Sequence, residues 1–281
     1  MTQTKLQDIF IYPIKSCAGI RANQWSVTQK GLKYDRQWMI IDQNGQFLSQ
    51  RKLPQMALIQ PTILDQQLAL SAPEMEEIKF SLKLPETSEV LQVNIWQDQC
   101  QAKSVSHELD QWLSDFLKIN CKLVFQDQND IRQVDQQYAK PQDQVYFSDG
   151  FPFLIISENS LADLNSRMPY QISMLRFRPN LVISGCRSFA EDYWREIKIG
   201  EISFRLPKPC SRCPIPNIDP KTGKTSKHTI KTLNQYRRFN NQVYFGQNAL
   251  HNESGVLNVN DPVKVLVTGD PQPPLLNTNP Y

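Results

Sequence analysis

The sequence lacks an excess of charge of either sign. Its 31 Lys and Arg residues stand against 28 Asp and Glu residues, which leaves a net charge of +3 over 281 residues. Nucleic-acid-binding domains usually carry a marked basic excess, so this balance gives no support for a nucleic-acid partner. Hydrophobic residues make up 40% of the chain and aromatic residues 10%, which excludes wholesale disorder. The length suffices for one large domain or two ordinary ones.

Long apolar runs and dense cysteines are also missing. No stretch reaches the roughly 18 apolar residues of a membrane-spanning helix, and the opening MTQTKLQDIFIYP has no apolar segment typical of a signal peptide. Six cysteines in a chain of this length are too dilute for a disulfide scaffold. We therefore expect a cytoplasmic protein with reduced thiols and no membrane span.

Strand patterns dominate the first hundred residues. Short runs rich in β-branched and aromatic residues occur at 6–14, 67–73, 78–84 and 91–96. Segment 37–50 predicts a hairpin, because Asn44-Gly45 suits a type I′ turn between two apolar runs. Apolar residues then recur at helical spacing over 107–119, and residues 126–147 read as a polar, Gln-rich surface connection.

The second half of the chain reads as a separate unit. Strands are expected at 151–157, 180–184, 196–200 and 201–206, and helices at 158–168, with Asn159 or Ser160 near the N-cap, and at 229–239. Segment 256–267 predicts a hairpin that turns at Asn260-Asp261-Pro262. The prediction is a mainly β (α+β) protein with domains at 1–125 and 126–270 and a Pro-rich tail at 271–281.

The densest unusual segment is the Pro-rich stretch 207–223, which displays Cys210, Arg212 and Cys213 directly after a predicted strand. Five prolines within 14 residues indicate an ordered loop. A thiol held beside a guanidinium suits a thiolate ligand or nucleophile. Half of a zinc site, a redox CxxC pair and ordinary loop cysteines are the alternatives. A zinc site would need a second pair of ligands, and the three histidines do not show the usual spacing for one.

Several residues elsewhere in the sequence are of types that bind anions. Lys15, Ser16 and Cys17 fall in a turn after the first strand, and Arg36 lies at the entry of the next one. Arg178 precedes Pro179, which predicts an extended backbone and a fixed anion contact. Residues 149–152 form a sharp turn before a strand. Each of these features alone is more often a solvated side chain or a simple connector.

Together these motifs resemble a known family. YPIKSCAG, YDRQWMIID, SDGFPFLIISENSLADLN, FRPNLVISG with EDYWREIKIG, and CSRCPIPNIDPKTG occur in the order found in MOSC-domain proteins. The chain specifically resembles the molybdenum enzymes of the mitochondrial amidoxime-reducing component and their bacterial hydroxylaminopurine-reducing relatives, from about residue 4 to residue 268. The resemblance implies a β-rich MOSC N-terminal domain packed on a MOSC β-barrel with a few helices, and a cofactor between them.

The resemblance also implies a molybdenum cofactor, in which a pyranopterin dithiolene and one protein thiolate hold the metal. The matching thiolate is Cys213, and soft sulfur ligands suit such a metal. The family's cofactor contacts carry over to residues in five of the motifs: Lys15, Ser16, Arg36, Asp149, Gly150, Phe151, Arg178, Ser211 and Arg212. Asp219 is the carboxylate nearest in sequence to the ligand loop, either as a proton donor or as a loop anchor. Pro214 and Pro216 depart from the animal proteins, which indicates a stiffer loop.

The implied activity is the reduction of small N-hydroxylated molecules from N–OH to N–H, without pyridoxal phosphate. Some bacterial relatives carry a ferredoxin-type domain, but this chain has no second cysteine cluster for an iron–sulfur centre. Electrons are therefore expected from a separate electron-transfer protein and its reductase. A non-catalytic cofactor carrier or sulfur-handling binding module is the alternative.

Overall fold

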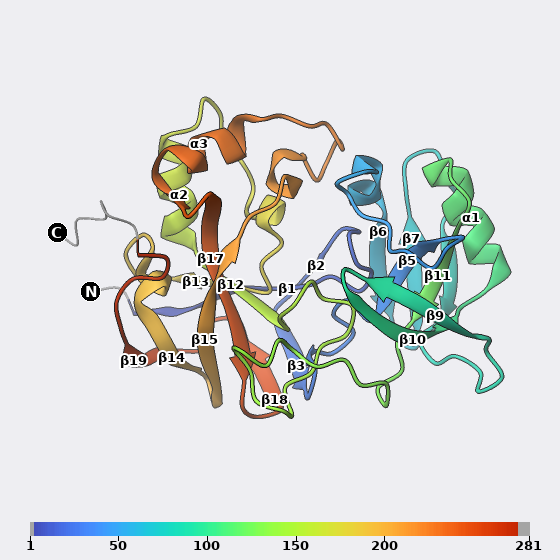
Figure 1. The fold of residues 1–281 in the computed structure, drawn as a ribbon, viewed down its shortest axis with the longest axis horizontal. Helices are drawn as coiled ribbons and strands as arrows, with labels where there is room; N and C mark the ends of the chain where they lie inside the picture. Colours follow the sequence, from blue (N-terminus) through green and yellow to red (C-terminus); the bar gives the residue numbers. More distant parts are fainter. Residues whose placement is uncertain (1–2, 275–281) are drawn as a thin grey trace.

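The computed structural model describes residues 3–274 and shows two lobes side by side (Figure 1). The barrel lobe, at the left of Figure 1, contains a nine-stranded sheet, and the second lobe contains two smaller sheets and helix α1. The mainly β fold class is confirmed. The connection at 126–147 has no helix or strand, as predicted, but it does not lie wholly on the surface, because Val134, Val145 and Phe147 are buried.

The sheet of the barrel lobe follows the order β19-β14-β15-β17-β12-β13-β1-β2, with β16 paired to β17. Its strands are β1 (Lys5–Ile11), β2 (Ile20–Ala22), β12 (Phe153–Ser157), β13 (Leu181–Ser184), β14 (Trp194–Ile199), β15 (Ile202–Ser211), β16 (Arg238–Phe239), β17 (Gln242–His251) and β19 (Val263–Thr268). A bridge connects Lys5 of β1, next to one end of this order, with Pro262, which directly precedes β19 at the other end, so the sheet curls toward a barrel. Its enclosed core contains Ile9, Phe153 and Phe204 among other apolar residues.

The second lobe packs two antiparallel sheets around a core of its own. One sheet contains β5 (Trp38–Asp42), β11 (Cys121–Phe125), β10 (Asp98–Ser104) and β9 (Val90–Ile95), and the other contains β6 (Gln60–Leu64), β7 (Gln67–Ser71) and β8 (Ile78–Ser81). Helix α1 (His107–Leu117) begins after Ser106, whose hydroxyl caps it, and buries Leu109, Trp112 and Leu113. Strand β11 was not predicted, although it lies centrally beside β5.

The first strands of the chain belong to the barrel lobe. Strand β1 pairs with β13, while β3 (Gln24–Thr28) pairs with β4 (Gly31–Leu32) and with β18 (Gly255–Asn258). The side chains of β1 and β3 lie in the barrel core, whereas Ile14 and Cys17 between them lie in the core of the second lobe. Within the predicted first domain at 1–125, strands β1 to β4 therefore pack with the barrel lobe. The chain contributes Ile14 and Cys17 to the core of the second lobe and returns to that core from Tyr34 onward.

Three local predictions are corrected by the structure. The turn at Asn44-Gly45 is not type I′, because Gly45 has φ +73° but Asn44 does not share the positive φ, and the Asp42 carboxylate instead accepts the N–H of Asn44 at 2.8 Å. The N-cap of α2 (Glu158–Ser166) is Ser157, whose hydroxyl accepts the N–H of Ser160. Segment 256–267 is no hairpin, since β18 pairs with β3 and β19 with β14.

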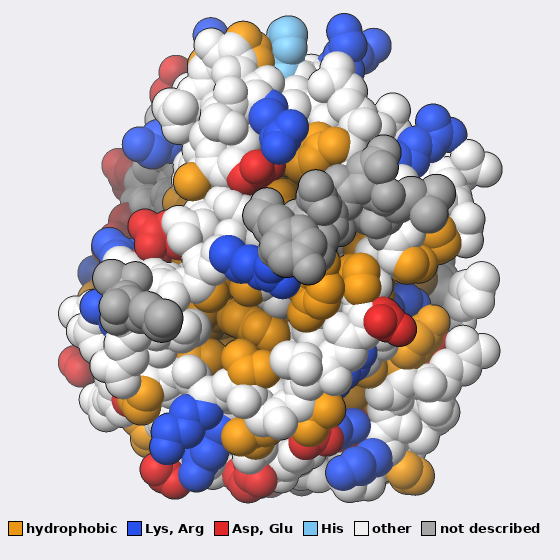
Figure 2. Space-filling model, turned by 90° about the vertical axis from the view of Figure 1, so that its left-hand side faces the viewer, with side chains coloured by type: hydrophobic (Ala, Val, Ile, Leu, Met, Phe, Trp, Pro, Cys, Tyr) orange, Lys and Arg blue, Asp and Glu red, His pale blue; other side chains and the backbone are white. Residues whose placement is uncertain are grey.

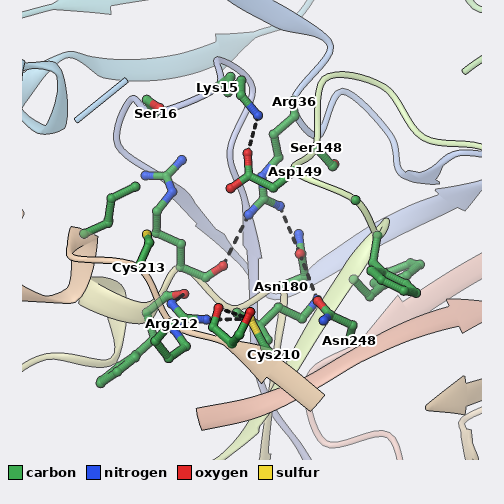
Figure 3. Close-up of a pocket in the computed structure, with 18 of the residues that line it drawn as sticks. Lys15, Ser16, Arg36, Ser148, Asp149, Asn180, Cys210, Arg212, Cys213 and Asn248 are labelled. Atoms are coloured by element: carbon green, nitrogen blue, oxygen red, sulfur yellow. Dashed lines mark hydrogen bonds and ion pairs between the residues drawn. The ribbon is translucent and has the colours of Figure 1, made fainter. Parts of the chain in front are cut away.

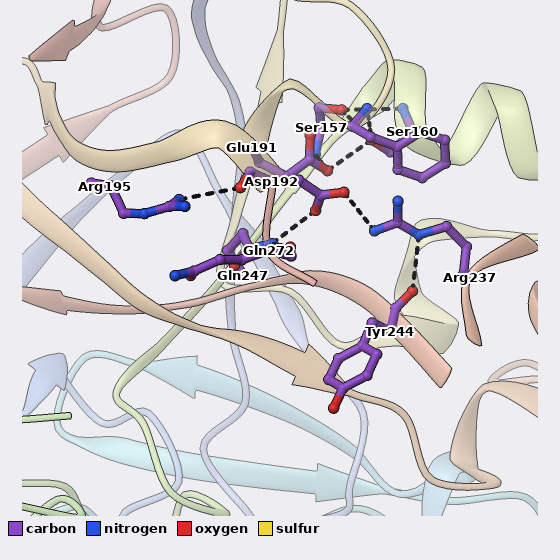
Figure 4. Close-up of polar contacts among 10 residues, drawn as sticks. Ser157, Ser160, Glu191, Asp192, Arg195, Arg237, Tyr244, Gln247 and Gln272 are labelled. Atoms are coloured by element: carbon purple, nitrogen blue, oxygen red, sulfur yellow. Dashed lines mark hydrogen bonds and ion pairs between the residues drawn. The ribbon is translucent and has the colours of Figure 1, made fainter. Parts of the chain in front are cut away.

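A buried polar cluster ties helix α3 (His228–Tyr236) and the short turn of η3 (Ala190–Tyr193) to the barrel (Figure 4). Arg237 is 0% exposed and donates from Nη2 to Asp192 Oδ2 at 2.7 Å. The other oxygen of Asp192 accepts from Gln247 Nε2 at 2.8 Å. Burial raises the pKa of Asp192 to about 6, against the opposing effect of Arg237.

Apolar side chains are exposed on the face of the molecule that Figure 2 shows. Figure 2 shows hydrophobic side chains gathered near the middle of this face, and edge strand β19 exposes Val265, Leu266 and Val267. Among residues 3–274, no helix is both long and apolar enough to cross a membrane. Part of the predicted Pro-rich tail, residues 275–281, lies outside the described residues.

Candidate functional site

A pocket between the two lobes collects most of the candidate residues (Figure 3). Its lining includes all nine residues expected to contact a cofactor, and Cys213: Lys15, Ser16, Arg36, Asp149, Gly150, Phe151, Arg178, Ser211, Arg212 and Cys213. These residues come from five separate stretches of sequence. Only the packing of the lobes brings them together.

The Lys15 side chain reaches the pocket from the turn that follows β1. Ser16 has φ +67°, and the Cys17 N–H closes the turn on the Ile14 carbonyl at 3.1 Å. Lys15 is 4% exposed and donates to the Phe147 carbonyl at 2.7 Å and to Asp149 Oδ1 at 2.5 Å. Burial lowers the pKa of Lys15, and the Asp149 carboxylate opposes that shift.

Two guanidinium groups, Arg36 and Arg178, lie against the ring of Tyr12. Their Cζ atoms are 4.4 Å and 4.2 Å from the ring centroid. Arg36 donates to Asn180 Oδ1 at 2.9 Å and pairs with the neighbouring Asp35. Arg178 Nη1 donates to the Cys17 carbonyl at 2.5 Å. Two like charges are therefore held close together over one buried aromatic ring.

The backbone at Arg178 corrects the extended conformation predicted from Pro179. Arg178 has φ +57° and ψ +46°, the left-handed region, and ends η2 (Met174–Phe177) with its N–H on the Leu175 carbonyl at 3.2 Å. A following proline disfavours the right-handed helical region, and the left-handed conformation also avoids that region. This turn directs the side chain into the pocket rather than along the strand.

The pocket has more positive charge than its protein partners neutralise. Its lining contains five cationic side chains (Lys15, Arg36, Arg51, Arg178 and Arg212) but a single carboxylate, Asp149. Burial and the neighbouring Arg36 lower the pKa of Arg178 to about 10. Among the described residues, Arg178 Nη2 and Arg212 Nε are buried without a hydrogen-bond partner. Unpaired buried donors beside excess cations fit an anionic group such as a phosphate.

The strand before the cysteines extends further along the chain than the predicted range 201–206. Strand β15 extends through Cys210 and Ser211, with Ser211 opposite Tyr244 of β17, and the register shifts where Pro207 and Pro209 interrupt the ladder. The loop proper starts at Arg212 and continues into η4 (Ile215–Asn217). The strand therefore fixes one end of the loop that presents Cys213.

The two cysteines of this segment have different surroundings. Arg212 Nη1 donates to Cys210 Sγ at 2.9 Å, and Arg212 Nη2 donates to the Phe177 carbonyl at 2.8 Å. Cys213 lines the same pocket, is half-buried, and makes no hydrogen bond or ion pair with another described residue. The Cys213 thiol is thus the one left available to a ligand. Burial raises the pKa of Cys17 to about 12, so that thiol stays protonated at neutral pH.

Asp219 does not line the pocket. Its Oδ2 accepts from Arg176 Nη2 at 2.8 Å, and its Oδ1 accepts the N–H of Lys221 at 2.9 Å. These contacts hold the turn that follows η4. Of the two roles expected for Asp219, these contacts fit the loop anchor.

Sequence reasoning missed four polar residues that line the site: Arg51, Ser148, Asn180 and Asn248. Asn180 is 1% exposed; its amide oxygen accepts from Arg36, and its nitrogen donates to the Phe10 carbonyl at 3.2 Å. Its place in the FRPN motif beside Arg178 was an available signal. Arg51 and Asn248 also line the pocket, and nothing in their local sequence marks them.

No all-protein metal site accompanies Cys213. Across residues 3–274, no three His, Cys, Asp or Glu side chains form a group that could hold a metal ion. This result disfavours the zinc alternative, which needs three or four protein ligands. The donor set fits a metal that brings its other ligands with it and takes one thiolate from the protein.

Comparison with known proteins agrees with this arrangement. Residues 3–120 match the family described as MOSC N-terminal beta barrel domain, and residues 142–264 match the family described as MOSC domain. Mitochondrial amidoxime-reducing component 1 of Mus musculus is 36% identical over 275 residues, which cover 92% of this chain and 81% of that protein. The chain belongs to the MOSC family.

Other relatives extend the comparison. Mitochondrial amidoxime-reducing component 1 of Homo sapiens is 35% identical over 92% of this chain and 82% of that protein. Molybdenum cofactor sulfurase of Homo sapiens is 31% identical over 87% of this chain, but the match covers 30% of that protein. The solved structure of the YUAD protein from Bacillus subtilis is 9% identical, with a TM-score of 0.41 over 93% of this chain and 94% of that one.

Proposed function

We propose that this MOSC protein is a molybdenum-cofactor-dependent reductase of small N-hydroxylated compounds. The observation that carries the proposal is the free Cys213 thiol at the edge of a pocket with excess buried positive charge. The names of the relatives support it, since they include amidoxime-reducing components and a molybdenum cofactor sulfurase.

The residues present fit such a cofactor. Cys213 would supply one soft sulfur ligand to molybdenum, and Arg36 and Arg178 would bind the phosphate. Lys15 would add charge to the same region, where it already pairs with Asp149. When bound, the cofactor supplies two-electron exchange with the substrate. The protein holds the anion, fixes the thiolate on a loop anchored by β15 and Asp219, and leaves room beside Cys213 for a substrate.

The proposed reaction is balanced by two electrons and two protons. The N–O bond of an R–NH–OH substrate breaks, the product is R–NH₂, and the oxygen leaves as water. The electrons come from a separate one-electron carrier protein that is reduced in turn by its own reductase. Cations around α3 give this carrier an attractive surface if it is acidic, and include Lys221, Lys224, Lys227, Lys231 and Arg238.

We expect the purified holoprotein to reduce benzamidoxime with chemically reduced viologen dye and not with NADH alone. The sequence has no G-x-G-x-x-G after a strand and implies a single redox centre, so hydride electrons have no route from nicotinamide to the metal. Absorbance assays of dye and of NADH oxidation measure the two reactions. Steady NADH oxidation by the pure chain, without added reductase, would show that a further cofactor site exists.

Removal of a phosphate anchor should lower the cofactor content. The wild-type protein, made in a host that synthesises the cofactor, is expected to carry roughly one molybdenum per chain. Arg36→Ala and Arg178→Ala each remove a charge-assisted contact worth about 1.5–3 kcal/mol, and Lys15→Ala should act more weakly because an ammonium binds less directionally. Metal and pterin analysis measures the loss, with Arg21→Ala as an exposed control. Unchanged content in all three variants would refute the assigned cofactor contacts.

The second candidate is a cofactor carrier or sulfur-handling module, which the likeness to molybdenum cofactor sulfurase favours. In that case Cys213 would dock the cofactor or hold a persulfide. A carrier should retain molybdenum yet reduce no N-hydroxylated compound with the viologen donor. The same dye assay therefore separates the two functions.

A further inference from the structure

A second cleft adjoins the pocket at Cys213 and is lined by both lobes. It shares Arg51, Asp149 and the segment 211–213 with the pocket described above, so the two spaces meet at the cysteine. The inner pocket holds the cations that fit a cofactor. The outer cleft is the space from which a second molecule would reach Cys213.

One wall of the outer cleft is the indole of Trp96. It lies in the turn between β9 and β10, has φ +56°, and is 49% exposed. Two-residue hairpin turns favour glycine at a left-handed position, and a bulky residue there is strained by about 1–3 kcal/mol. Residues held in such strained backbone conformations cluster at active sites and ligand-binding sites.

The Trp96 ring is held in place from two sides. The Phe47 ring packs against it at 4.9 Å between centroids, and the Arg51 guanidinium carbon lies 4.6 Å from it. Phe47 in turn lies 5.1 Å from Lys15 Nζ, and Arg51 lies 3.7 Å from Asp149. The indole is therefore positioned by Arg51, which lines the inner pocket, and by Phe47, which contacts the pocket residue Lys15.

Another wall of the outer cleft comes from the barrel lobe and combines an apolar side chain with two side-chain amides. Ile230 of α3 contributes the apolar part. The amide oxygens of Asn241 and Gln242 already accept bonds, from Arg238 at 2.8 Å and from the Tyr244 hydroxyl at 2.9 Å. Within residues 3–274 their amide nitrogens donate to no partner. This wall offers hydrogen-bond donors across from an aromatic face.

We propose that the outer cleft binds the planar aromatic part of the substrate against Trp96, with its N–OH group directed toward Cys213. Trp96 is the specificity-determining residue, and Arg51 holds it in place. An aromatic face with a few convergent polar groups is the usual composition of a site for a flat heteroaromatic molecule. The inference rests on the proposed reductase function and adds a preference for aromatic over small aliphatic substrates.

The test compares two substrates in three variants of the holoprotein with viologen as donor. For benzamidoxime, Trp96→Ala should lower kcat/KM about 10-fold, the effect of losing one stacking contact. Trp96→Phe should keep most of the activity, and N-methylhydroxylamine should be reduced at the wild-type rate by all variants. Tyr170→Ala is the matched control, because Tyr170 is a similarly exposed aromatic residue (40%) outside the cleft.

Binding of benzamidoxime without reductant, measured by titration calorimetry, tests the same wall independently of turnover. The dissociation constant should rise about 10-fold in Trp96→Ala and remain unchanged in Tyr170→Ala. Equal losses for both substrates, or unchanged binding, would overturn the inference. A loss seen only with a protein donor would assign the cleft to carrier docking instead. A wild-type protein that holds molybdenum and reduces neither substrate would refute the reductase function itself.

Discussion

Cys213→Ala is expected to abolish the reduction of N-hydroxylated compounds, whereas Cys210→Ala should retain a substantial part of it. The Cys213 sulfur lines the pocket without a partner among the described residues, so its removal takes away the single protein ligand that the site offers to a metal. Cys210 instead accepts from Arg212 at 2.9 Å, and Arg212 keeps its second bond to Phe177 when that sulfur is lost. Viologen-dependent turnover, normalised to protein concentration, measures both effects.

Molybdenum content and thermal unfolding are the controls for this pair of variants. Cys213→Ala should unfold at the wild-type temperature within a few degrees, because a half-buried thiol without a hydrogen bond adds little to stability. Equal loss of activity in the two variants would contradict the assignment and favour a paired dithiol. Full activity in Cys213→Ala would rule out the cysteine as a metal ligand.

Arg237→Met is expected to lower the free energy of unfolding by about 3–5 kcal/mol, the range for a buried ion pair that loses one partner. Arg237 and Asp192 are both almost fully buried and lie 2.7 Å apart, and Arg237 Nε also donates to the Tyr244 carbonyl at 3.2 Å (Figure 4). Methionine fills much of the same space but leaves the Asp192 carboxylate without its cation. Urea unfolding of the two proteins measures the difference.

The loss of unfolding free energy in Arg237→Met should be larger at high pH than at low pH. Burial raises the pKa of Asp192 to about 6 in the folded protein, above its unfolded value, so the folded state binds this proton more tightly. Ionisation of Asp192 therefore lowers stability as the pH rises from about 4 to about 6. Without Arg237 that penalty grows, so the variant should lose more stability at pH 8 than at pH 5.

The control for this prediction is Arg167→Met. Arg167 pairs with Asp163 one helical turn away on the surface and also lies over the Tyr236 ring, with its Cζ atom 4.3 Å from the centroid; each such surface contact contributes up to about 1 kcal/mol. The loss of unfolding free energy in this variant should be small and the same at both pH values. A loss in Arg237→Met that is as small as in the control, or that is larger at pH 5, would show that the buried pair does not stabilise the barrel.

Local sequence determined most of the secondary structure and the identity of the motifs. Helix α1 follows from its apolar spacing and the Ser106 cap, and β12 follows from an unbroken apolar run. These patterns succeed because the spacing of apolar residues decides which face can be buried. The KSC, FRPN and CSRC motifs likewise identified residues that meet in one pocket, since each motif carries charge or sulfur where a simple connector would not need it.

The pairing of strands and the directions in which side chains point were decided only by the tertiary structure. The alternation in 256–267 indicated two strands, but nothing local could show that β18 pairs with β3, more than 200 residues away in sequence. Arg51 and Trp96 entered the site for the same reason, because their positions depend on how the second lobe packs on the barrel. The backbone of Arg178 was mispredicted because its left-handed turn is stabilised by long-range contacts, among them the Cys17 carbonyl. A sequence pattern records which side chains avoid water, whereas contacts between distant segments depend on the free energy of the whole fold.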